Sequence, residues 1–132
     1  MSKKILTITL FLLISLSLGA CSAGNNAAAT TVESYLSALA EKDDALLVSY
    51  ICPEFEFQAL LEFDSFSIVK TQLKDVACQE TNSQDGQVDV VCQGSIEAAY
   101  GNELRSFDLS RRTYHLIEQD GTWLVCGYDD AN

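Results

Sequence analysis

The chain has 132 residues, 48% of them hydrophobic, with five cysteines and a formal net charge of −11. This length suits one globular domain, and the negative charge disfavours binding to nucleic acid or to anionic lipid headgroups. The acidic residues are scattered, as on a solvated surface, and we expect Glu54, Glu56, Glu62 and Asp64 to face solvent.

The N-terminal segment has the zones of an export signal. Lys3 and Lys4 precede an apolar run from Ile5 to Leu18. The 14 residues of this run match the length of a signal peptide and fall short of the roughly 20 residues that span a bilayer. We therefore expect a removable leader and no transmembrane anchor.

A short motif, Leu18-Gly19-Ala20-Cys21, follows the apolar run. It resembles the lipobox of bacterial lipoproteins, in which the leader is cut before a cysteine that carries a diacylglyceryl group. The resemblance implies a signal peptide over residues 1–20 and lipid, palmitate included, on Cys21. The protein would then be held on the extracytoplasmic side of a membrane of the bacterial cell envelope. An ordinary secretory signal is the alternative.

Residues 21–29 are expected to form the lipidated cysteine and a flexible tether. The stretch from Ser22 to Ala29 is small, polar and without periodicity, and eight such residues span about 15 Å. A single domain over residues 30–130 should follow. Since two of the 8 basic residues lie in the leader, the mature chain keeps 6 basic residues against 19 acidic ones.

Three helices are predicted between Thr31 and about Asp64. Thr30 and Glu33 have the spacing of a capping box, which satisfies free amides at a helix start. Asp43 can cap a second, short helix, and Pro53 suits the first turn of a third. The apolar residues of the first helix recur at helical spacing: Val32, Tyr35, Leu36 and Leu39.

Beyond Asp64 the apolar pattern changes to period 2, which predicts an antiparallel sheet. The four predicted strands are Phe66–Glu80, Gln87–Tyr100, Leu104–Gln119 and Thr122–Tyr128. Turn signals separate them at residues 82–86, 101–102 and 119–121.

In two of these strands, the apolar residues switch from one face of the strand to the other along its length. A bulge near Arg111 and Arg112 would bring both halves of the third strand onto the core face and bend it, and a similar slip is expected in the first strand. The sheet should therefore be strongly curved. The expected inner-face residues are Val88, Val90, Ile96, Phe107, Leu109, Tyr114 and Leu116.

Three N-terminal helices followed by about four long, curved strands resemble the nuclear transport factor 2-like superfamily, a cystatin-like α+β cone whose helices fill the concave side of the sheet. Residues 32–43 resemble the opening helix and acidic turn of this superfamily. Residues 120–125 resemble its last hairpin, with a turn before a tryptophan-bearing strand. The resemblance implies the fold but no activity, since the superfamily includes isomerases, dehydratases, hydrolases and binding domains.

The cysteine count fits export. With Cys21 taken by lipid, four cysteines remain, an even number suited to an oxidising compartment. Cys78 and Cys92 are equidistant from Asp85, so a symmetrical hairpin would place them opposite each other. The other expected pair is Cys52 and Cys126. No metal is expected, because a zinc site usually has close Cys-x-x-Cys pairs and the sequence contains none.

Only candidates emerge for a catalytic or binding site. His115 is the single histidine, and Asp108 is a candidate acid. Successive side chains of a strand point to opposite faces, so if Tyr114 points inward, His115 points outward. The ligand-binding candidates are Tyr35, Arg112, Tyr114 and Trp123, of which Trp123 is expected mainly to pack in the core.

Two hypotheses about function follow. The first is a non-catalytic envelope lipoprotein that binds a small apolar ligand or a protein partner, and the second is a tethered acid–base enzyme of isomerase or dehydratase type. No expected inner-face residue titrates near neutrality, which favours binding. Paired ionisable groups inside the cone would favour the enzyme, whereas an aromatic filling would favour the binder. No cofactor is expected, and a homodimer through the sheet face is a further expectation.

Overall fold

The structure is a computed structural model that describes residues 26–131. The expected signal peptide, Cys21 and residues 22–25 of the expected tether lie outside the described residues. Within the described range, no helix is long and apolar enough to cross a membrane. The elements are α1 (Ala27–Glu41), α2 (Asp44–Ser49), η1 (Pro53–Phe55), α3 (Glu56–Phe66), β1 (Lys70–Gln84), β2 (Gln87–Tyr100), β3 (Glu103–Asp108), η2 (Leu109–Arg111), β4 (Arg112–Gln119) and β5 (Thr122–Asp130).

The first helix, α1, begins at Ala27, three residues before the expected start of the domain. Ala28 and Ala29 are buried, and the Ala28 N–H donates to the Glu80 carboxylate at 2.9 Å. These alanines looked like part of a tether because they carry no apolar periodicity. Alanine has the highest helix propensity, however, and its small side chain lets α1 pack closely on β1.

The capping box predicted at Thr30 is wrong. The Thr30 hydroxyl donates to the Asn26 carbonyl at 3.0 Å, inside the helix rather than at its start. The Glu33 carboxylate accepts from the Cys78 N–H at 3.0 Å, so it binds β1 instead of the helix terminus. A long-range contact replaces the local one that the sequence spacing suggested.

The second and third helices follow the expected signals. The Asp43 side chain caps α2 by accepting from the Leu46 N–H at 2.9 Å, and Pro53 opens the short η1 turn that leads into α3. Between them, the chain runs extended along β5. The Cys52 N–H donates to the Val125 carbonyl and the Val125 N–H donates to the Tyr50 carbonyl, each at 2.8 Å.

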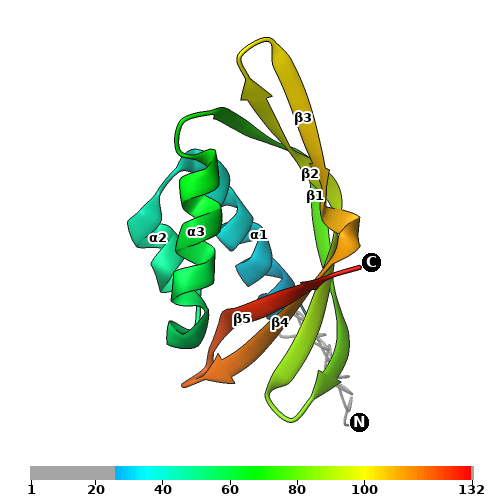
Figure 1. Cartoon of the computed structure of the whole chain (residues 1–132). Coiled ribbons are helices and arrows are strands. Elements are labelled where there is room, and N and C mark those ends of the chain that lie inside the picture. The colour runs from blue at the N-terminus through cyan, green and yellow to red at the C-terminus, as the bar shows by residue number, and fades with distance from the viewer. Residues whose placement is uncertain (1–25, 132) are drawn as a thin grey trace, which may run out of the picture.

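The helices lie on one side of a curved antiparallel sheet, and the β2–β3 hairpin extends beyond the helical layer (Figure 1). The strand order is β1-β2-β4-β5, with β3 also paired to β2. The Asp85–Gly86 and Asp120–Gly121 turns, both with positive φ at each residue, close two of the predicted hairpins. The expected α+β architecture is confirmed.

The third predicted strand is two strands. β3 and β4 both pair with β2 and are separated by the turn η2, so the sheet has five strands and not about four. The Asp108 carboxylate accepts from the Ser110 N–H at 2.9 Å and starts this turn. A capped turn, and not a bulge, thus produces the change of parity near Arg111.

The expected slip in β1 is confirmed. The β1–β2 register shifts between Lys74 and Ala77, where Asp75 has a φ of 50°. Gly94 lies opposite with a φ of 91°. A Cβ atom on Gly94 would lie 2.6 Å from the Asp75 carbonyl oxygen, so the close approach of the two strands requires glycine here.

The cysteines meet in the two expected pairs. Cys78 lies directly opposite Cys92 on the β1–β2 hairpin with a Cα–Cα distance of 4.0 Å. Cys52 meets Cys126 with a Cα–Cα distance of 4.8 Å, joining the segment before η1 to β5. Both pairs form disulfides, one within the sheet and one between the helical layer and the sheet.

The inner face of the sheet is as predicted except at one position. The buried residues are Val88, Val90, Ile96, Leu109, Tyr114 and Leu116. Phe107 was expected in the core, but it is 41% exposed, and its ring packs edge-on against Phe66 with centroids 5.5 Å apart. A pocket between α3 and β3 leaves part of the Phe107 ring uncovered.

Candidate functional site

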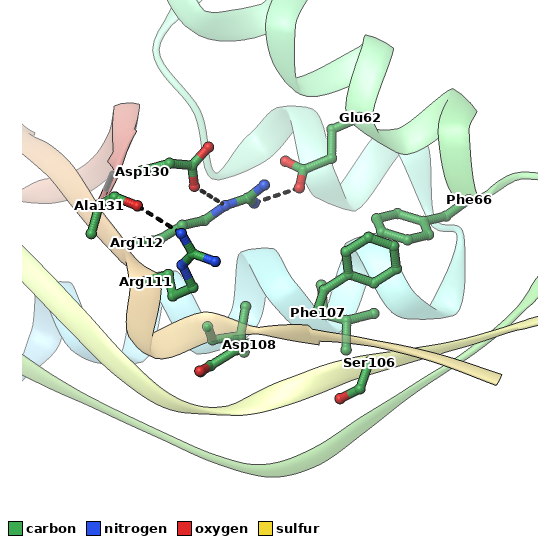
Figure 2. Close-up of a pocket in the computed structure, with 11 residues that line it drawn as sticks. Glu62, Phe66, Ser106, Phe107, Asp108, Arg111, Arg112, Asp130 and Ala131 are labelled. Carbon is green, nitrogen blue, oxygen red and sulfur yellow. Dashed lines mark hydrogen bonds and ion pairs between the residues drawn. The ribbon is translucent and has the colours of Figure 1, made fainter.

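A pocket of about 410 Å³ opens where the C-terminal end of α3 faces β3 and η2. We call it the mouth pocket (Figure 2). Its lining residues are Glu62, Phe66, Ile96, Ser106, Phe107, Asp108, Leu109, Arg111, Arg112, Asp130 and Ala131.

Arg112 forms the centre of the polar side of the mouth pocket. Its Nη1 donates to Glu62 at 2.5 Å and its Nε donates to Asp130 at 3.0 Å. The guanidinium carbon also lies 3.9 Å from the centroid of the Tyr128 ring, a cation–π contact. Burial alone would lower the pKa of Arg112, but the Glu62 carboxylate raises it above its usual range, so the charge is permanent. Arg112 thereby joins α3 to β4 and β5.

Glu62 is the buried partner in this arrangement, and its expected place on a solvated face is wrong. Its side chain is only 9% exposed. One oxygen accepts from Arg112, and the other accepts from the Tyr35 hydroxyl at 3.1 Å. Because both oxygens are engaged, this carboxylate holds two side chains in place and does not reach into the pocket as an unpaired base.

Aromatic rings fill the interior behind Arg112. Tyr35 and Tyr114 are fully buried with ring centroids 6.3 Å apart, and Tyr128 packs against Tyr114 at 5.8 Å. Burial raises the pKa of each of these three tyrosines, so all of them are neutral at physiological pH. The Tyr114 hydroxyl has no hydrogen-bond partner among residues 26–131.

The other side of the mouth pocket is apolar. Phe66 from α3 and Phe107 from β3 lie opposite the two arginines, as Figure 2 shows. Ile96 and Leu109 complete this wall and are buried beneath it. The pocket therefore has one aromatic side and one charged side.

His115 lies on the opposite, outer face of the sheet, as its parity indicated. Its Nδ1 is 2.7 Å from the Asp89 carboxylate and its Nε2 is 2.9 Å from the Asp129 carboxylate. The side chain is 42% exposed. His115 is thus within hydrogen-bond reach of two carboxylates, but outside the cone and away from the mouth pocket.

The remaining predicted site residues divide between the mouth pocket and the core. Asp108 lines the pocket, where its carboxylate accepts from the Ser110 amide and hydroxyl and makes no contact with His115. Trp123 is half-buried against the core and does not line the pocket. The described residues contain no group of three or more His, Cys, Asp or Glu side chains that could hold a metal ion.

Several residues of the mouth pocket were not singled out from the sequence. Glu62 carries no local signal of burial, because its partner Arg112 is 50 residues away in the chain. Arg111 and Asp130 also belong to no sequence motif that would mark them as pocket residues. The Asp-Leu-Ser spacing at residues 108–110 could have indicated the capped turn that brings Arg111 and Arg112 to this position.

The fold and this pocket define an α+β cone of the cystatin-like type. A protein with a cystatin-like fold from Caulobacter vibrioides superposes with a TM-score of 0.56 at 12% identity, covering 81% of this chain and 89% of that one. A SEC-C motif containing protein from Rhodopseudomonas palustris gives 0.52 at 12% identity, covering 77% of each chain. Bd1075 from Bdellovibrio bacteriovorus gives 0.50 at 11% identity, covering 78% of this chain and 38% of that one. These likenesses show the fold alone.

No protein-family model matches the sequence, and no curated protein matches it. The cystatin-like cone serves both binding domains and enzymes, so the fold alone does not define the function.

Proposed function

We propose that this protein is a lipid-anchored, extracytoplasmic binding module whose mouth pocket holds a small ligand with an apolar body. The observation that carries the proposal is Phe107. This phenylalanine is 41% exposed on the concave side of the sheet and forms, with Phe66, the aromatic wall of a pocket. Pockets of a few hundred cubic ångströms with apolar walls and a few polar groups are the usual form of small-molecule sites.

The state of the ionisable groups supports binding without turnover. Glu62 and Arg112 are the paired inner groups that an acid–base enzyme would need, but both oxygens of Glu62 already accept hydrogen bonds. The inner tyrosines remain neutral at physiological pH because burial raises their pKa values. His115 lies on the outer face with both ring nitrogens engaged. None of these groups is therefore placed to exchange a proton with a ligand in the pocket.

The lipobox-like motif supports the anchoring part of the proposal. The helix α1 begins at Ala27, so five residues separate it from Cys21. A random-coil tether of five residues would span about 12 Å. A lipid on Cys21 would hold the domain close to the membrane surface, and lipid-derived or membrane-permeating small molecules would be concentrated there.

The pocket is tested with a neutral probe, 4-phenylbutanamide, titrated calorimetrically into the purified full chain. We expect binding that Phe107→Ala weakens about tenfold, because truncating an aromatic anchor commonly costs more than 1 kcal/mol. Leu104→Ala is the matched control, since Leu104 lies on the same strand, is 64% exposed and does not line the mouth pocket. Absence of binding, or equal weakening by both substitutions, would refute the proposed site.

A further inference from the structure

The charged side of the mouth pocket indicates which ligands it accepts, and we propose that Arg111 binds the carboxylate of an amphipathic organic acid. This inference rests on the proposed function and names the ligand class of the same pocket. The ligand would place an apolar, preferably aromatic, body against Phe66 and Phe107 and a single carboxylate against the Arg111 guanidinium.

The two arginines of the pocket differ in whether their charges are already paired. Arg112 is paired with Glu62 and Asp130, one on each side of its guanidinium. The Arg112 charge is thus already balanced by two carboxylates, and a ligand carboxylate could take the place of Glu62 or Asp130 only by breaking an ion pair. Breaking a half-buried pair leaves a charge without its partner, which is unfavourable.

Arg111 differs from Arg112 in this respect. Its Nη2 donates to the Ala131 carbonyl at 3.1 Å, and it takes part in no ion pair among residues 26–131. The neighbouring carboxylate is Asp108, which accepts from the Ser110 amide at 2.9 Å and from the Ser110 hydroxyl at 2.7 Å. Those hydrogen bonds and the Arg111 charge lower the pKa of Asp108, yet the two side chains form no ion pair. Arg111 therefore offers unused donors to the pocket.

The geometry connects this charge to the aromatic wall. Figure 2 shows the Arg111 guanidinium on the side of the pocket opposite Phe66 and Phe107. A guanidinium is planar, and its donors match the two oxygens of a carboxylate. A ligand that crosses the pocket would thus meet apolar carbon at one end and a paired set of N–H donors at the other. A cationic ligand would meet Arg111 as a repulsive charge.

The experiment compares 4-phenylbutyrate with 4-phenylbutanamide, which share one apolar body and differ in charge. In calorimetric titrations of the purified full chain at neutral pH, we expect the carboxylate to bind about tenfold more tightly than the amide, the size of one charge-assisted hydrogen bond at a solvent-open site. Arg111→Gln should remove this preference, so that the carboxylate and the amide bind the variant with similar affinities. Arg105→Gln is the control, because Arg105 is an exposed arginine of β3 outside the pocket, and it should keep the preference.

The possible failures are distinguishable. If the amide binds the wild type as tightly as the carboxylate, or if Arg111→Gln retains the preference, the carboxylate assignment is overturned while the pocket itself stands. If neither compound binds, both the assignment and the proposed function are overturned. Tighter binding of 4-phenylbutylamine than of 4-phenylbutyrate would also overturn the assignment, since it would show that Asp108 and Asp130 dominate the pocket.

Discussion

His115 connects three strands through its two ring nitrogens, to Asp89 on β2 and to Asp129 on β5. A protonated imidazole can donate at both nitrogens, whereas a neutral one can donate at only one. Burial alone would lower the pKa of His115, but the hydrogen bonds to the two carboxylates raise it above its ordinary value of 6.5. The same contact lowers the pKa of Asp89 below 3.8.

These shifts predict a pH dependence of stability. The His115 contribution should be complete below about pH 6.5 and should be lost as the pH rises through the raised pKa of the folded state. The Asp89 contribution is lost only in acid, below its lowered pKa. Because the His115 side chain is 42% exposed, solvent screening limits the effect to about 1 kcal/mol or less.

The measurement is the urea midpoint of the disulfide-intact protein between about pH 6 and pH 9, with His115→Gln as the control. The wild-type midpoint should fall over this range by more than that of His115→Gln. Two parallel pH profiles would show that the contacts of His115 contribute nothing to stability.

Gly94 is the second residue with a specific consequence. We expect Gly94→Ala to destabilise the fold by about 2 kcal/mol or more, because alanine disfavours the φ of 91° and its Cβ would meet the Lys74 and Asp75 carbonyl oxygens. Gly86→Ala has a similar φ of 75° but meets no atom within 4 Å, so it should cost only about 1 kcal/mol. Equal unfolding midpoints for the two variants would contradict the close approach of β1 and β2.

At the scale of the elements, the β1–β2 hairpin pairs Cys78 with Cys92, as predicted, but through a ladder that is not regular. The turn is centred between Asp85 and Gly86, so an unbroken ladder would set Cys92 opposite residue 79. A register shift between Thr81 and Gln84, where Asn82 has a φ of 44°, moves the ladder by one residue and brings Cys78 to Cys92. The equal spacing about Asp85 anticipated the result but not the irregularity that produces it.

The helices and turns were predictable because their signals are local. Asp43 caps a neighbouring amide, Pro53 fixes the backbone of a first helical turn, and the Asp-Gly pairs favour tight turns; the structure uses each as expected. The start of α1 and the split between β3 and β4 were not predicted, since both depend on contacts between distant segments. The Glu62–Arg112 pair is the clearest case, because a surface-type residue becomes buried only when α3 meets β4.

The two disulfides should differ in how much they stabilise the fold. In the chain-entropy model, closing the Cys78–Cys92 loop contributes about 3 kcal/mol, and the longer Cys52–Cys126 loop contributes about 4.5 kcal/mol. The sequence separations are 14 and 74 residues. We expect the Cys52→Ala/Cys126→Ala variant to unfold at a lower urea midpoint than the Cys78→Ala/Cys92→Ala variant. Non-reducing peptide mapping that joins Cys52 to Cys78 would contradict the pairing.

At the scale of the whole molecule, the proposed lipid on Cys21 would decide where the domain works. Cys21→Ser removes the thiol that would receive the lipid, so we expect loss of labelling with radioactive palmitate and loss of partition into the detergent phase. Ser22→Ala, which leaves Leu18 to Cys21 intact, should label and partition as the wild type does. Palmitate labelling that survives Cys21→Ser would show that the lipobox reading is wrong.

The extended segment from Tyr50 to Cys52 has a consequence for self-association. An open sheet exposes unpaired N–H and C=O groups along its outer strands, and these groups can recruit strands from other molecules into growing aggregates. Here the Val125 N–H and C=O on the outer side of β5 are taken by Tyr50 and Cys52. On β1, another outer strand, the irregular backbone at Asp75 interrupts the row of groups that a neighbour could use. These two strands would thereby resist edge-to-edge polymerisation, whereas β3 pairs only with β2 and keeps one open edge.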